Sequence, residues 1–338
     1  MSPVTRRAMA WASLAASAVL WVATPAEGYL KFGFTDGTVS RVLKWNESRP
    51  VTYVVGNRGV TGVSVQQFDE AVARAFRTWE DVPSASLRFA RAGVASPRLD
   101  DNDGVTMLAF DSRPDLDRTL AATSYTIDLT TAEILEVDVF FNEAFQWSVA
   151  AGGQPGRFDL ESIALHEIGH LAGLGHSALG ETEQLSGGSR RLIAAGAVMF
   201  PIAFSPGNID GRRLQPDDIA GLSDIYAAPD FRARTGSVSG RVLRDGIGLL
   251  GAHLTAYHLR TGALVSGFTL DLAGNYVLAG LDAGPIVLRV EPLDDGDVES
   301  FLSGPGVDAD FRPAFFDRVV YVPAGGNVAG LDIRVSRP

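Results

Sequence analysis

Apolar residues recur in two different patterns along the chain, and the patterns predict two kinds of structural region. Between residues 44 and 226, short apolar runs alternate with helical patterns, as they do in α+β proteins. After residue 236 the apolar runs are short and strand-like, and turns that contain Gly and Asp separate them. The patterns therefore predict an α+β domain over residues 44–228, a linker over residues 229–236 and an all-β sandwich over residues 237–338.

The α+β region begins with a predicted buried strand at residues 51–55 and one well-marked helix. Ser64 and Gln67 have the spacing of a capping box, which marks a helix start, and Pro83 marks the end. Apolar residues between them recur every three or four positions, so they share one helix face that we expect in the core: Phe68, Val72, Phe76 and Trp79. Further strands are predicted at residues 105–110, 120–126 and 137–141.

The C-terminal region contains strand-like runs and no helical pattern. Gly274, Gly280 and Gly284, with the strands around them, resemble the carboxypeptidase-regulatory-like, transthyretin-like fold. This resemblance implies a small β-sandwich and says little about activity. His253 and His258 lie on opposite faces of one predicted strand, which argues against a metal site between them. The predicted strands lie at residues 240–243, 253–259, 264–270, 276–278, 286–290, 319–322 and 331–335.

The N-terminus has the pattern of an export signal. Arg6 and Arg7 precede an uncharged apolar run over residues 8–22, and small residues follow it. The run is shorter than the roughly 20 residues that a membrane-spanning helix needs, so a membrane anchor is the weaker alternative. We expect a signal peptide over residues 1–26, a short N-terminal segment over residues 27–43, and an exported product with no membrane anchor after cleavage.

Composition and charge narrow the classes of function. The 338 residues include 29 Lys and Arg against 40 Asp and Glu, a net charge of −11, which disfavours nucleic acids and anionic lipid as partners. A content of 46% hydrophobic and 20% charged residues excludes intrinsic disorder. The chain has no cysteine, which excludes disulfides, thiolate metal sites and thiol nucleophiles. Any metal site must therefore use histidine or oxygen ligands.

One helix is predicted to present two metal-binding histidines. Asp159 is placed to cap a helix that contains His166, Glu167 and His170. Residues four apart share a helix face, so both imidazoles can bind one Zn²⁺. Glu167 then lies beside the open coordination position of that ion.

A third histidine completes the pattern. Gly173 lets the chain leave the helix in a left-handed conformation, and His176 follows it. Three neutral nitrogens leave the fourth tetrahedral position for water, which is the arrangement of a catalytic zinc ion rather than a structural one. The three are also the only histidines before residue 237.

The segment from His166 to Ser177 resembles the zinc signature of metzincin metallopeptidases, and Ser177 directly after the third histidine resembles their matrixin branch. Met199 and Pro201 lie in a segment similar to the Met-turn, in which a methionine packs beneath the zinc ion. Residues 214–226 are similar to the closing helix of the family. The resemblance implies an α+β fold with a twisted, mostly parallel sheet, an antiparallel edge strand, an active-site helix and a C-terminal helix.

The resemblance also implies a reaction. It implies a secreted zinc endopeptidase with one catalytic Zn²⁺ bound by the three histidines, with Glu167 as general base and a protein or peptide as substrate. Leu120 and Ala121, at the edge strand, would align the substrate backbone. Pro201 would form part of the pocket beyond the scissile bond.

Three features depart from the matrixin pattern. Ala122 stands where vertebrate members usually have a histidine that helps bind a second, structural zinc ion, so we expect that second site to be absent. Residues 178–195 form an insertion between the third ligand and the Met-turn, expected at the rim of the cleft. The absence of cysteine excludes latency through a cysteine bound to zinc.

Several alternatives stay open at this point. A binding or adhesion protein with an inactive metzincin domain is one, although the intact Glu167 argues against it. A serralysin- or astacin-like metzincin is another, and Ser177 argues against that branch. The acidic turn at residues 101–104 is interpreted as a solvated turn, with a structural Ca²⁺ site as the alternative. Tyr125, Tyr226 and the zinc ion itself are candidates for stabilising the oxyanion.

The basic residues are unevenly divided between lysine and arginine. Lys31 and Lys44 are the only lysines among 29 basic residues, which is typical of a genome-wide bias toward arginine. Together with the predicted signal peptide, this bias indicates a bacterial enzyme that acts outside the cell. We expect it to be a monomer.

Overall fold

The computed structural model describes residues 7–13, 30–36, 39–113, 116, 118–186, 190–293 and 306–338. Residues 1–6 and 14–26 of the predicted signal peptide, with the predicted cleavage position, lie outside the described residues. Its remaining residues form strand β1 (Arg7–Ser13). In the described ranges, no helix has the length and apolar character needed to cross a membrane.

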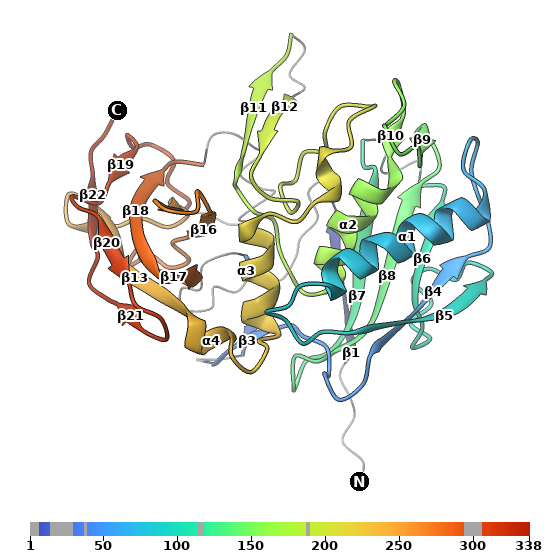
Figure 1. Ribbon diagram of the computed structural model, residues 1–338, viewed down its shortest axis with the longest axis horizontal. Coiled ribbons are helices and arrows are strands. Elements are labelled where there is room, and N and C mark those ends of the chain that lie inside the picture. Colours follow the sequence, from blue (N-terminus) through green and yellow to red (C-terminus); the bar gives the residue numbers. More distant parts are fainter. Residues whose placement is uncertain are drawn as a thin grey trace.

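A six-stranded sheet with the strand order β1-β7-β8-β6-β4-β5 forms the centre of the first unit (Figure 1). Strands β4, β5, β6 and β8 are parallel, and β7 is antiparallel to β8, so the predicted α+β class is confirmed. Strand β5 was not predicted, because it is a half-exposed edge strand of mostly small residues without an apolar run. The bounds are β4 (Val51–Gly56), β5 (Phe89–Ala95), β6 (Thr106–Asp111), β7 (Ala121–Asp128) and β8 (Ile134–Asn142).

Strand β1 pairs antiparallel with the outer side of β7, from Ser13 opposite Ala122 to Arg7 opposite Asp128. The outer side of β7 is therefore covered, whereas the sequence predicts an edge strand there. Because β1 belongs to the predicted signal peptide, cleavage after residue 26 would leave β7 at the edge. An edge strand presents unpaired N–H and C=O groups that can pair with another chain.

Two helices cover one face of this sheet (Figure 1). Helix α1 (Val65–Glu80) begins at the predicted capping box, in which the side chain of Ser64 accepts a hydrogen bond from the N–H of Gln67 at 3.2 Å. Its four predicted core residues are all buried. Helix α2 (Leu160–Leu171) lies beside α1, and the indole N–H of Trp79 donates to the carbonyl of Leu165 at 2.8 Å.

Short elements complete the first unit. The β2–β3 hairpin lies between β1 and β4 along the chain. The β11–β12 hairpin after α2 occupies the predicted insertion, whose residues 187–189 lie outside the described residues. This second hairpin projects from the body of the molecule (Figure 1). The bounds are β2 (Gly33–Asp36), β3 (Val39–Val42), β9 (Trp147–Ser148), β10 (Phe158–Asp159), β11 (Gly180–Gln184), β12 (Arg190–Ala195), η2 (Asp210–Arg212) and α3 (Pro216–Ile225).

Two five-stranded sheets form the C-terminal unit, which we call the sandwich. One contains β14, β13 and β17 with β21 and β22 beside β13, and the other contains β16, β15, β18 and β19 with β20 beside β18. Apolar residues of both sheets, among them Val238 and Leu288, meet in one buried cluster. The bounds are β13 (Thr235–Arg244), β14 (Ile247–Gly248), β15 (His253–His258), β16 (Leu264–Phe268), β17 (Asn275–Asp282), β18 (Gly284–Glu291), β19 (Ala314–Phe315), β20 (Val320–Val322), β21 (Asn327–Val328) and β22 (Ile333–Val335).

The two units are in direct contact. The predicted linker at residues 229–236 contains helix α4 (Phe231–Arg234) and the first residues of β13. Helix α3 lies between the units (Figure 1), and its Ala220 belongs to the apolar cluster of the sandwich. Another apolar cluster joins Phe200 of the first unit to Phe268 of β16.

We predict that Phe68→Ala lowers the free energy of unfolding by about 3–5 kcal/mol, because it opens a cavity in the core. Phe68 is 0% exposed, and its ring lies 4.6 Å from that of Phe110 and 5.5 Å from that of Phe141, measured between centroids. Urea denaturation followed by tryptophan fluorescence checks this value. Phe315→Ala, at a side chain that is 63% exposed, is the matched control and should change stability by less than about 0.5 kcal/mol.

Candidate metal centre

Helix α2 presents two of the three predicted metal-binding histidines. Asp159 caps the helix, and its carboxylate accepts a hydrogen bond from the N–H of the third helical residue at 3.0 Å. His166 and His170 follow one turn apart. Gly173, with a φ of 96°, takes the left-handed conformation that a residue without a Cβ adopts without strain. The turn that follows brings His176 to the other two imidazoles.

The three imidazoles have the donor set of a zinc site. Their candidate ligand atoms all lie within 4.8 Å of one another, and the rings are buried. Nδ1 of His166 faces the carbonyl of Val198, and Nδ1 of His170 faces the carbonyl of Leu174, both at 2.8 Å. Because a carbonyl can only accept, these contacts put the proton on Nδ1 and the lone pair on Nε2. Nε2 of His166 is buried with no hydrogen-bond partner, so the residues fit a bound metal ion.

Burial keeps the imidazoles of His166 and His170 neutral. It lowers the pKa of His166 to about 3 and the pKa of His170 well below its ordinary value. The neighbouring imidazoles act in the same direction, because two protonated rings at this distance would repel each other. At neutral pH both rings therefore have a lone pair available, and a metal ion need not displace protons from them.

Glu167 lies beside these histidines and is 1% exposed. The hydroxyl of Thr123, on β7, donates to Oε2 of Glu167 at 2.7 Å. Burial raises the pKa of Glu167 to about 8, and the hydrogen bond from Thr123 opposes that rise because it favours the charged form. A carboxyl group that titrates near neutrality is suited to accepting and returning a proton. Sequence reasoning missed Thr123 as a site residue, because this contact joins residues 44 positions apart.

The segment before residue 44 supports the turn that leads to the third histidine. The N–H of Phe32 donates to the carbonyl of Gly173 at 2.9 Å, and the N–H of Gly175 donates to the carbonyl of Leu30 at 2.7 Å. The ring of Phe32 also lies 5.5 Å from the ring of His170. The segment between β1 and β4 thus contacts both this turn and the second histidine, although no sequence motif marks it.

Met199 packs beneath α2. Its side chain is 2% exposed, and a Cβ added at Gly169 would overlap its Sδ. Asp218 of α3 accepts hydrogen bonds from the N–H groups of Val198 at 2.9 Å and Met199 at 3.1 Å. Burial raises the pKa of Asp218 to about 6. Contacts from α2 and α3 thus hold the segment around Met199 in place.

The predicted substrate-binding residues fall at two places. Pro201 lines a cavity of about 50 Å³ beside His166, which Leu192 of the β11–β12 hairpin also lines. Leu120 and Ala121 are buried at the start of β7, the strand that contains Thr123.

Both tyrosines considered for the oxyanion are engaged elsewhere. The hydroxyl of Tyr125 donates to the carbonyl of His170, and the hydroxyl oxygen of Tyr226 accepts from the N–H of Trp45 at 3.0 Å. Burial raises the pKa of both phenols.

A comparison with protein families points to the same part of the chain. The family model described as Matrixin matches residues 44–185. Residues 44–185 form a matrixin domain. This domain includes α2, the three histidines and β7, whereas Met199 lies beyond the matched residues.

Relatives of known name match more than half of the chain. The hatching enzyme of Paracentrotus lividus is 26% identical over 197 residues, which is 56% of this chain and 27% of that protein. Stromelysin-1 of Mus musculus is 26% identical over 193 residues, 55% of this chain and 33% of that protein. The chain therefore spans about a third or less of the length of these relatives.

Solved structures resemble the chain only distantly. The minor pilin GBS52 of Streptococcus agalactiae covers 31% of this chain, and 45% of the pilin is matched, at 14% identity and a TM-score of 0.21. A TM-score that low does not distinguish one fold from another.

Side chains in and beside the acidic turn at residues 101–104 make contacts within the protein. Asp100 binds Arg113 at 2.6 Å, and the carboxylate of Asp103 accepts from the N–H of Val105 at 3.0 Å. Such contacts are those of a hydrogen-bonded surface turn. Within the described residues, the three histidines form the one group of His, Asp or Glu side chains placed to bind a metal ion.

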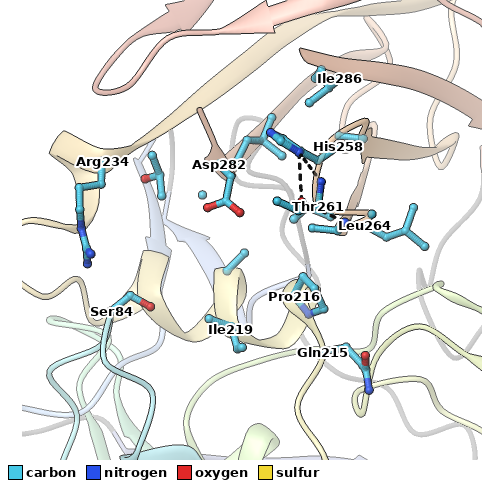
Figure 2. Close-up of a pocket in the computed structure, with 18 of the residues that line it drawn as sticks. Ser84, Gln215, Pro216, Ile219, Arg234, His258, Thr261, Leu264, Asp282 and Ile286 are labelled. Atoms are coloured by element: carbon cyan, nitrogen blue, oxygen red, sulfur yellow. Dashed lines mark hydrogen bonds between the residues drawn. The ribbon is translucent and has the colours of Figure 1, made fainter. Parts of the chain in front are cut away.

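Figure 2 shows a larger cavity, of about 720 Å³, between α3 and the sandwich. Pro216 and Ile219 of α3 line it from one unit, and His258 and Leu264 line it from the other. Nδ1 of His258 accepts a hydrogen bond from the N–H of Thr261 at 3.2 Å. The cavity is thus distinct from the metal centre of the matrixin domain.

We predict that Gly169→Ala weakens zinc binding at least tenfold and lowers the free energy of unfolding by about 1–3 kcal/mol. The new Cβ would overlap Met199 and would lie 2.8 Å from Cζ2 of Trp79, so the helix or the methionine must shift. Competition with a zinc chelator measures the affinity. Gly152→Ala is the matched control, because a Cβ there meets nothing within 4 Å. Equal zinc affinity in the two variants would show that this packing does not constrain the site.

Proposed function

We propose that this protein is a secreted zinc-dependent endopeptidase that hydrolyses peptide bonds in proteins. The observation that supports this most directly is the group of three buried imidazoles, whose candidate ligand atoms lie within 4.8 Å of one another, beside the buried carboxyl group of Glu167. The matrixin domain and the names of its relatives support the same class of activity. Export rests on the sequence pattern of residues 1–26.

The roles follow from the chemistry of each group. His166, His170 and His176 would bind the zinc ion through Nε2, because Nδ1 of the first two is used by backbone carbonyls. When bound, zinc supplies Lewis-acid activation of water and of the substrate carbonyl. Glu167 accepts the proton of the attacking water at a carboxylate oxygen and returns it to the leaving amine. Thr123 fixes the carboxylate through Oε2 and so leaves Oε1 for that proton.

Strand β7 is suited to aligning the substrate. After cleavage of the predicted signal peptide its outer side would present backbone groups next to Thr123 and Glu167, where an extended peptide can pair as an additional strand. The cavity that Pro201 and Leu192 line lies beside His166 and would accept the side chain that follows the scissile bond. Because Leu192 belongs to the insertion, the β11–β12 hairpin would influence which side chain fits.

The decisive experiment is casein cleavage by the protein that lacks residues 1–26, with and without a zinc chelator, beside Glu167→Gln. We predict that the chelator abolishes cleavage and that Glu167→Gln lowers kcat/KM by about 10²–10⁴-fold, the range for loss of a general base, with zinc content unchanged. Glu161→Gln is the control on the same helix, since Glu161 instead pairs with Arg74 at 2.7 Å. A zinc-loaded protein that leaves casein and unstructured peptides intact would favour the alternative of a binding protein.

We further predict that Thr123→Val lowers kcat about 10- to 100-fold and leaves KM and zinc content unchanged. Valine has nearly the shape of threonine but cannot donate to Glu167, and a hydrogen bond to a charged group contributes about 1.5–3 kcal/mol. Thr123→Ser keeps the donor and should retain most of the activity. Thr126→Val is a control on the same strand, because Thr126 donates to Asn102 instead. Full activity of Thr123→Val would remove this role for the hydroxyl.

A further inference from the structure

A buried polar contact links the metal centre to the sandwich. Ser177, directly after His176, donates through its hydroxyl to Oδ2 of Asp217 on α3 at 2.6 Å. Ser266 of β16 donates to Oδ1 of the same carboxylate through its backbone N–H at 2.7 Å, and its hydroxyl lies 3.3 Å from both carboxylate oxygens. The exposed fractions of Ser177, Asp217 and Ser266 are 3%, 2% and 0%.

The carboxylate of Asp217 depends on donors from both units. A buried carboxylate is stable only when hydrogen bonds replace its lost water, and Asp217 receives them from Ser177 on one side and Ser266 on the other. Because each oxygen has a different donor, the position of β16 determines the orientation of the carboxylate. That orientation in turn determines where the hydroxyl of Ser177 lies.

Ser177 is also tied to the other loops of the site. Its N–H donates to the carbonyl of Met199 at 2.9 Å, and its hydroxyl accepts from the N–H of Leu179 at 3.2 Å. Asp218, the neighbour of Asp217, binds the N–H of Met199 at 3.1 Å. The first turn of α3 therefore contacts two segments of the metal centre, the one directly after His176 and the one around Met199.

Strand β16 makes this contact beside an incompletely filled interface. Pro216 of α3 and Leu264 of β16 both line the cavity in Figure 2, so the two units leave space between them there. Farther along β16, Ser266 reaches Asp217, and Phe268 joins the apolar cluster that contains Phe200. One strand of the sandwich thus contacts the first unit through a polar residue, Ser266, and an apolar residue, Phe268.

We infer that Ser266 and Asp217 are positioning residues for the third metal ligand, so that the sandwich is an integral part of the metal centre. They act through Ser177 on His176. The inference rests on the proposed zinc site, but it concerns metal affinity rather than cleavage. Outer hydrogen-bond partners of metal ligands commonly change metal affinity 10- to 100-fold when they are removed.

The test measures zinc affinity of the full chain by chelator competition, which requires no substrate. Asp217→Ala should weaken zinc binding 10- to 100-fold. Ser266→Ala, which keeps the backbone donor, should weaken it about three- to tenfold, the effect of one hydrogen bond. In the Asp217→Ala background, Ser266→Ala should have a smaller effect than in the unsubstituted chain, because only the direct contact between the hydroxyls of Ser266 and Ser177, at 3.4 Å, remains. If Ser266→Ala weakened zinc binding only by destabilising the fold, its full effect would add to that of Asp217→Ala.

Two sandwich variants serve as matched controls. Ser237→Ala and Asp332→Ala remove side chains that bond Asn327 and Arg241 within the sandwich, and zinc affinity should stay within twofold of the unsubstituted chain. If Asp217→Ala does not fold, Ser266→Ala alone decides the question. Folded Ser266→Ala protein with zinc affinity within twofold of the controls would overturn the inference.

The outcomes for the two proposals are distinguishable. A chain that binds zinc but cleaves no protein contradicts the proposed function, and the zinc affinities of the variants still decide the role of the sandwich. A chain that cleaves casein while all variants bind zinc equally contradicts only this inference. A chain that binds no zinc contradicts both.

Discussion

The structure depends on one constraint: three imidazoles must be buried close together, neutral and with Nε2 directed at a common point. Burial supplies the neutrality, since it lowers the pKa of His166 to about 3. The carbonyls of Val198 and Leu174 supply the direction, since they occupy Nδ1. These carbonyls belong to the segment around Met199 and to the turn after α2, so both must be held in place.

Helix α3 and the N-terminal segment hold the carbonyls of Val198 and Leu174 in place. Asp218 binds the N–H groups of Val198 and Met199, which fixes the first of these carbonyls. Residues 30–32 pair with the turn that contains Leu174, which fixes the second. Buried carboxylates are costly, and the structure places them at the start of a helix, where backbone N–H groups favour negative charge. Asp217 at the same helix start extends this arrangement to the sandwich through Ser266.

The proposed chemistry and the proposed positioning role therefore involve different parts of one network. At the contact between α2 and β7, Glu167 would accept and transfer the proton of the attacking water, and Thr123 would fix its carboxylate. Ser177, Asp217 and Ser266, at the contact between α3 and β16, would position the third metal ligand. A change in the first set should affect turnover at unchanged metal affinity, and a change in the second should affect metal affinity first.

The sequence by itself determined the features that short-range spacing encodes. The capping box at Ser64, the apolar face of α1 and the alternation of strands were predicted because each depends on residues within a few positions of one another. The spacing of His166, Glu167 and His170, with the Gly173 turn, likewise indicated a metal site from one local segment. The assignment of Met199 required a resemblance, because a single methionine has no spacing to interpret.

Tertiary structure alone decided which distant residues support those features. Thr123 meets Glu167, Phe32 meets Gly173, and Ser266 meets Asp217, each across a long stretch of chain. Threonine, phenylalanine and serine are common in strands and loops for other reasons, so no local pattern distinguishes these three from their neighbours. Their roles arise only when strand pairing and the packing of α3 against the sandwich bring them to the metal centre, because a hydrogen bond depends on distance in space rather than on distance along the chain.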